Sequence, residues 1–140
     1  MDQHTIVFKE LINEATQLLK NDTENEQVIV VKTAKGHIYH CINRSMGRRS
    51  GFEYDVTDEE NFISMLRDQD DTELQAIAAL WNPCVTETSI PASCSVDIPS
   101  WHLRQCLFNL HPENRNTLVL LVGDQGYLAK RLGDLMPKTD

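Results

Sequence analysis

The sequence is poor in positive charge and has no long apolar run, and both deficits exclude classes of protein. Lys and Arg contribute 13 side chains against 21 from Asp and Glu, which gives a formal net charge of -8. A protein that binds nucleic-acid phosphates with release of counterions needs a positively charged surface, so we expect no nucleic-acid partner. Apolar runs such as residues 117–122 are far too short to cross a bilayer, and we expect no membrane association.

The sequence also lacks closely spaced cysteines, and its first residues do not have the pattern of a secretory leader. Cys41, Cys84, Cys94 and Cys106 stand at wide spacings with no Cys-x-x-Cys pair. The first residues do not form a basic region followed by an apolar stretch, so we predict no signal peptide. We therefore expect a cytoplasmic protein whose cysteines are buried thiols rather than disulfides or a zinc framework.

What the sequence does contain is typical of one globular domain. The chain has 140 residues, of which 41% are hydrophobic and 24% charged. This length buries most of its surface without disulfides, so we predict a single domain over residues 1–140.

Hydrophobic periodicity predicts an α/β fold. Apolar residues at helical spacing predict a helix over residues 5–20, and runs rich in Val and Ile predict a hairpin of strands 27–33 and 37–42. Further along, the patterns predict strands at 74–80, 117–122 and 127–129. They also predict one helix before the 74–80 strand, one between the 74–80 and 117–122 strands, and a brief final helix at 130–136. The predicted order is α-ββ-α-β-α-β-β-α, a single mixed sheet with helices on its faces.

Two segments carry strong helix-start signals. Thr57-Asp58-Glu59-Glu60 is a capping box, in which Thr57 caps the second helix and Glu60 reaches back to it. Ser100 follows Pro99 as the predicted N-cap of the third helix. The connection between these helices includes residues 81–99, an irregular stretch with three prolines, and loops of that length are usually functional.

Several segments resemble the cytidine deaminase family. Residues 99–107 (Pro-Ser-Trp-His-Leu-Arg-Gln-Cys-Leu) resemble its Pro-Cys-x-x-Cys-Arg-Gln segment with both cysteines replaced, and residues 126–137 resemble its closing strand and Leu-x-x-Leu-hydrophobic-Pro signature. Residues 37–43 are similar to the strand that ends at an Asn holding the nucleoside sugar, here Asn43. The long connection before Pro99 is similar to that of the blasticidin S deaminase branch. The resemblance implies the cytidine deaminase fold and, by analogy, a homo-oligomer, either a dimer or a tetramer.

The resemblance also implies a zinc site that this sequence has lost. It places the first zinc ligand at Thr57, the proton-shuttling Glu at Glu59, and the two Cys ligands at Ser100 and Leu103. Zinc takes imidazole, thiolate or carboxylate donors, whereas Leu103 has no donor and the other two positions carry neutral hydroxyls. We therefore expect neither a metal nor another cofactor. Thr57 and Ser100 then serve as helix caps, and Glu59 complements the helix dipole.

A rearranged metal site is the alternative. It would use Asp58, His102 and Cys106, which lie one residue or one helical turn from the expected positions. A step of one residue rotates a helical side chain by about 100°, so both helices would have to be re-registered.

The leading functional hypothesis is a catalytically inactive deaminase-like protein that acts by binding a nucleoside-like ligand or a protein partner. Its predicted cleft is bordered by Asn43, Glu59, Ser100 and His102. The competing hypothesis is an active nucleoside deaminase with the rearranged metal site, or zinc-free chemistry around Glu59, Ser100 and His102. Residues i and i+2 of a helix point away from each other, which disfavours Ser100 and His102 as a nucleophile–base pair.

Overall fold

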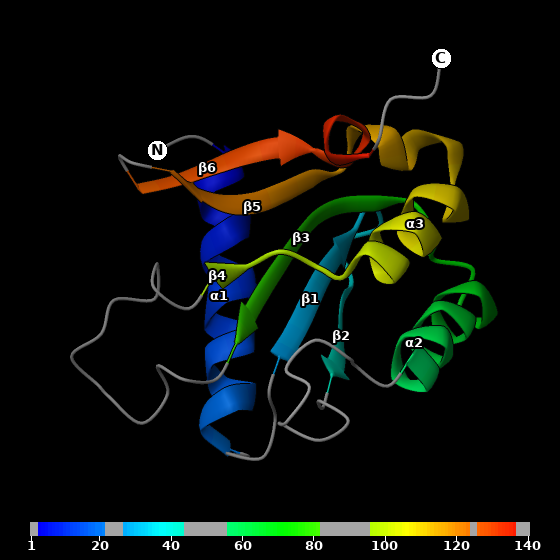
Figure 1. Ribbon diagram of the computed structural model, residues 1–140, viewed down its shortest axis with the longest axis horizontal. Coiled ribbons are helices and arrows are strands. Elements are labelled where there is room, and N and C mark those ends of the chain that lie inside the picture. Colours follow the sequence, from blue (N-terminus) through cyan, green and yellow to red (C-terminus); the bar gives the residue numbers. More distant parts are fainter. Residues whose placement is uncertain (1–2, 22–26, 44–55, 82–95, 124–125, 137–140) are drawn as a thin grey trace.

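A computed structural model of the chain describes residues 3–21, 27–43, 56–81, 96–123 and 126–136. Its centre is a six-stranded mixed sheet in the order β2-β1-β3-β5-β6, with β4 paired to β3 off this path. Helices lie on both faces of the sheet (Figure 1), so the predicted fold class is confirmed. The elements are α1 (Gln3–Asn21), β1 (Gln27–Thr33), β2 (Ile38–Asn43), α2 (Val56–Asp68), β3 (Leu74–Trp81), β4 (Val96–Asp97), α3 (Trp101–Leu110), the 3-10 helix η3 (Pro112–Asn116), β5 (Leu118–Gly123), β6 (Gly126–Arg131) and the 3-10 helix η4 (Leu132–Leu135).

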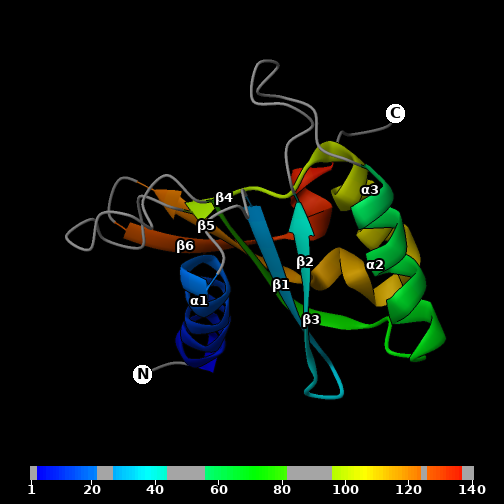
Figure 2. The same cartoon turned by 90° about the horizontal axis from the view of Figure 1, so that it is seen from below.

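The sheet has apolar layers on both faces. Successive residues of a strand point to opposite faces, so in β1 the side chains of Val28 and Val30 pack against α1, whereas Ile29 and Val31 join the cluster that holds α2 and α3. Figure 2 shows α1 on one side of the sheet and α2 and α3 on the other. Because both faces are covered, the inner strands β1, β3 and β5 are largely continuous apolar runs rather than alternating ones.

Strand β3 is the centre of the sheet and positions the helix that follows it. It pairs antiparallel with β1 along one edge; on the other edge its first half pairs parallel with β5 and its last residues pair with β4. The short strand β4 was not predicted, because two residues are too few to show a period. Gln27, 1% exposed, donates from Nε2 to Asp97 Oδ2 at 2.8 Å and so fixes β4 just before α3 begins.

Side-chain hydrogen bonds anchor helix α3 near both of its ends. Near its start, Arg104 donates from Nε to Pro99 O at 3.1 Å and from Nη1 to Leu135 O at 3.1 Å. Past its end, the buried amide of Asn114 donates to Leu107 O and Thr72 O and accepts from Leu74 N, each at 2.9 Å. The helix start therefore has a fixed position relative to the sheet.

The predictions for the C-terminal end and for the start of α2 need correction. Strand β6 does not stop at Ala129 but continues to Arg131, since β5 is long enough to pair with all of it, and the predicted helix at 130–136 shrinks to the four residues of η4. Helix α2 begins at Val56, so Thr57 lies inside its first turn and is not its N-cap. Asp55 and Thr57 are both cap-type residues, which is why the sequence places the start two residues late.

None of the helices in the described ranges is long and apolar enough to span a membrane.

Candidate functional site

The starts of α2 and α3 meet at a carboxylate–hydroxyl contact. Glu59 is the fourth residue of α2 and its side chain is 1% exposed. Ser100 is the N-cap of α3, as predicted, and its Oγ lies 3.0 Å and 2.8 Å from the two carboxylate oxygens of Glu59. The contact joins residues 41 positions apart in the sequence and brings together two of the four predicted cleft residues.

The Ser100 hydroxyl acts here as both an acceptor and a donor. The Oγ accepts a hydrogen bond from Leu103 N at 3.1 Å, which caps the helix. A hydroxyl has one hydrogen, so it donates to one Glu59 oxygen at a time. The Glu59 carboxylate thus lies beside the N-terminal ends of two helices, where their dipoles favour a negative charge.

Leu103 belongs to the core. Its side chain is fully buried in the cluster between the sheet and α2 and α3. Of the three positions that the resemblance assigns to zinc ligands, one is therefore an apolar core residue and one is a hydroxyl engaged as a cap. The third, Thr57, lies in the first turn of α2, and its side chain falls outside the described part of the structure.

Two thiols lie near Glu59 but neither is suited to bind metal as a thiolate. Cys41, on β2, is buried and donates from Sγ to Asp58 O at 3.7 Å. Its burial, together with the charges of Glu59 and Asp58, raises the pKa of the Cys41 thiol to about 12. Burial and the charges of Glu59 and Glu60 also raise the pKa of Cys106. Zinc binds the thiolate and releases the thiol proton, so a raised pKa weakens the affinity of either thiol for the metal.

The described contacts of the His102 ring are with Cys106 and Glu60 rather than with Glu59 or Ser100. Its Nε2 lies 3.7 Å from Cys106 Sγ and 4.0 Å from Glu60 Oε1, and its side chain is 40% exposed. Asp58 instead lines a hollow of about 310 Å³ between β2 and α2, together with Cys41 and Met65 among others. Across the described residues, no three or more His, Cys, Asp and Glu side chains form a group that could hold a metal ion.

Asn43 and Cys41 both belong to β2. Asn43 is the last residue of β2 and pairs with Gln27, but its side chain lies outside the described part. Cys41 was missed by the sequence analysis although a signal existed. Residues i and i+2 of a strand share a face, so the assignment of Asn43 to the cleft side also placed Cys41 on that side.

Comparison with known proteins identifies the fold. No protein-family model matches the chain, and no curated protein has a similar sequence. Among solved structures, the cytidine deaminase of Bacillus anthracis superposes with a TM-score of 0.65 at 16% identity, over 95% of this chain and 89% of that one. The enzyme of Burkholderia pseudomallei gives 0.59 at 20% identity over 100% of both chains. That of Mycobacterium leprae gives 0.60 at 15% over 94% of this chain and 98% of that one. The chain has the cytidine deaminase fold, as the sequence predicted.

Proposed function

We propose that this chain uses a deaminase fold to bind a ligand or partner and does not deaminate. The observation that carries the proposal is the contact of Ser100 Oγ with both oxygens of Glu59, at 3.0 and 2.8 Å. The resemblance gives Glu59 the position of the proton-shuttling carboxylate. In this chain that carboxylate is 1% exposed and acts as a link between two helix starts.

The donor set does not fit zinc. Ser100 offers a neutral hydroxyl that already caps α3 and bonds Glu59, and Leu103 offers an apolar side chain within the core. The nearby thiols of Cys41 and Cys106 have raised pKa values, which disfavours the thiolate form that zinc binds. The side chains of Ser100 and Leu103 therefore do not supply ligands for a catalytic metal at the helix starts.

We propose a nucleoside-like compound as the ligand, held in a cleft bordered by Asn43, Glu59, Ser100 and His102. The similar solved structures are cytidine deaminases, which supports this class of ligand. Trp101, the first residue of α3, is 48% exposed next to Ser100 and offers an aromatic face against which a base could stack. A protein partner at the same surface is the alternative outcome of the test below.

The experiment is thermal denaturation with a panel of nucleosides, run beside an ammonia assay with cytidine. A ligand that binds only the native state must raise the melting temperature as its concentration rises. We expect the melting temperature to rise with at least one nucleoside and no ammonia to be released from cytidine. The rise should be smaller in His102→Ala and unchanged in the control Lys130→Gln. A panel that leaves the transition unmoved would overturn the nucleoside proposal in favour of a protein partner. Ammonia release would establish the active-deaminase alternative.

We also propose that the chain assembles with copies of itself, as a dimer or tetramer, in the cytoplasm. The support is the resemblance, which places oligomer contacts on the helices around the active site. The exposed Trp101 at the start of α3 is a large apolar side chain of the kind that such contacts cover.

A further inference from the structure

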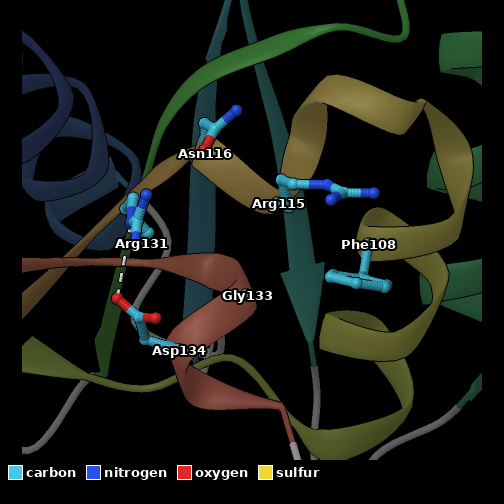
Figure 3. A pocket seen from close by; sticks show the side chains of 6 residues that line it. All are labelled: Phe108, Arg115, Asn116, Arg131, Gly133 and Asp134. Atoms are coloured by element: carbon cyan, nitrogen blue, oxygen red, sulfur yellow. Dashed lines mark hydrogen bonds and ion pairs between the residues drawn. The ribbon is translucent and has the colours of Figure 1, made fainter.

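The second half of α3 borders a hollow whose lining includes no residue from the starts of α2 and α3. It has a volume of about 350 Å³ and lies between α3, η3, β6 and η4 (Figure 3). Its lining residues are Phe108, Arg115, Asn116, Arg131, Gly133 and Asp134. Two guanidinium groups thus line one hollow of a chain whose formal net charge is -8.

The hollow exists because η4 approaches η3 closely. Leu132 N donates to Thr117 O at 2.7 Å, which seats the start of η4 beside the end of η3. A Cβ at Gly133 would lie 3.1 Å from the carbonyl oxygen of Arg115, tighter than side chains ordinarily allow. The glycine therefore permits the approach that places Arg115 and Arg131 on one hollow.

The two arginines differ in how far their charge is neutralised. Arg131 Nε lies 3.5 Å from Asp134 Oδ2, and both side chains are more than half exposed, so this pair is weak and open to competition. Arg115 donates from Nε to Pro112 O at 3.4 Å and forms no ion pair within the described ranges. The other carboxylate nearby, that of Glu113, accepts from Asn116 Nδ2 at 3.3 Å. The hollow keeps an excess of positive charge, centred on Arg115.

Phe108 adds an aromatic wall next to that charge. It comes from α3, is partly buried, and packs against the core cluster of α2 and α3. Figure 3 shows Arg115 and Phe108 on the same side of Gly133, with Arg131 and Asp134 on the other. A ligand that lies against the ring therefore has the Arg115 guanidinium within its reach.

We propose that this hollow binds a small molecule that carries both a phosphate monoester and an aromatic ring. The planar guanidinium of Arg115 presents paired N–H donors that match two phosphate oxygens, and Arg131 adds a second positive charge. The ring of the ligand packs against Phe108. A volume of 350 Å³ falls within the roughly 300–1,000 Å³ that small-molecule sites occupy. The proposal is independent of what the helix starts bind.

Isothermal titration calorimetry with phenyl phosphate and with inorganic phosphate tests the proposal on the full chain. We expect one phenyl phosphate per chain, bound about tenfold more weakly by Arg115→Gln and a few-fold more weakly by Arg131→Gln, in keeping with the loss of charged hydrogen bonds. Asp134→Asn removes the competing carboxylate and should tighten binding. Phe108→Leu should weaken phenyl phosphate but leave inorganic phosphate unchanged.

Lys130→Gln is the matched control. Lys130 neighbours Arg131 on β6 but points to the other face of the strand and does not line the hollow. The Lys130→Gln variant should therefore bind phenyl phosphate with the same affinity as the unmodified chain. A loss in Lys130→Gln equal to that in Arg115→Gln, or no loss in either arginine variant, would overturn the site. Equal affinities for the two phosphates would overturn the aromatic part of the proposal.

Discussion

At the scale of single residues, Ser100 links the two helix starts through one oxygen. Ser100→Ala removes both the cap on Leu103 N and the bond to Glu59. A lost cap costs about 1 kcal/mol and a hydrogen bond to a charged group about 1.5–3 kcal/mol, so we expect a loss of about 2–4 kcal/mol in the free energy of unfolding. Urea denaturation of both proteins measures this loss in the free energy of unfolding.

The matched variant for this prediction is Glu59→Met, which removes the acceptor at similar side-chain length, alone and combined with Ser100→Ala. Because the two side chains share one interaction, the losses in the double variant should be smaller than the sum of the single losses. Strictly additive losses would show that the contact contributes nothing to stability and would remove the main support for Glu59 as a structural residue.

Leu103 provides a second prediction at this scale. The side chain is fully buried, so Leu103→Ala should lower the free energy of unfolding by about 2–5 kcal/mol, and Leu103→Asp should cost several kcal/mol because it buries an unpaired charge. Leu103→Met, which conserves volume, should cost less than about 1.5 kcal/mol. An Asp variant with an unchanged melting temperature would contradict the role of this position as core.

At the scale of elements, the tip of the β1–β2 hairpin is joined to the loop before β3 through a buried acid. Asp71 is 2% exposed and accepts hydrogen bonds from His37 Nδ1 at 2.7 Å and Tyr39 OH at 2.9 Å. Burial acts to raise the pKa of Asp71, but hydrogen bonds from His37, Thr33 and Tyr39 and the charge of His37 outweigh it and hold the pKa below its usual value.

The pH dependence of stability follows from the sign of that shift. A carboxyl whose pKa is lower in the folded state stabilises the protein above its unfolded pKa, about 3.9 for Asp, and loses this contribution as the pH falls through the folded value. Asp71→Asn should therefore be less stable than the unmodified chain at pH 6, and the difference should shrink at pH 2–4. A constant difference across this range would show that Asp71 does not titrate as described.

The sequence predicted the main elements of this fold because their signals are long or chemically distinct. The apolar run of β1 and the Pro99-Ser100 cap of α3 were both placed correctly. The short strand β4 and the extent of β6 depend on pairing with β3 and β5, which no local pattern encodes. At the site, the Glu59–Ser100 contact could be anticipated only through the resemblance, since the two residues belong to separate helices. The contact of His102 with Glu60 depends on the packing of α2 against α3, which no local pattern encodes.

At the scale of the whole molecule, we expect self-association through the start of α3. Trp101 is 48% exposed, and Arg104 lies over its ring with the guanidinium carbon 5.4 Å from the ring centroid. Light scattering coupled to size exclusion should show a dimer or tetramer, and Trp101→Ser should shift it toward the monomer. Tyr127→Ser, an equally exposed aromatic on β6, serves as the control and should leave the assembly intact. A monomeric unmodified chain would contradict this expectation.

The most direct test of the central claim is the zinc content of the purified protein, measured beside that of the triple variant Thr57→Cys, Ser100→Cys, Leu103→Cys. If the chain is a deaminase fold without zinc ligands, the unmodified protein should carry no zinc above background. The variant should take up about one zinc per chain, because thiolates at these positions need only the geometry that the helix starts provide. A folded variant that takes up no zinc would show that these positions do not converge. Near-stoichiometric zinc in the unmodified protein would contradict the account directly.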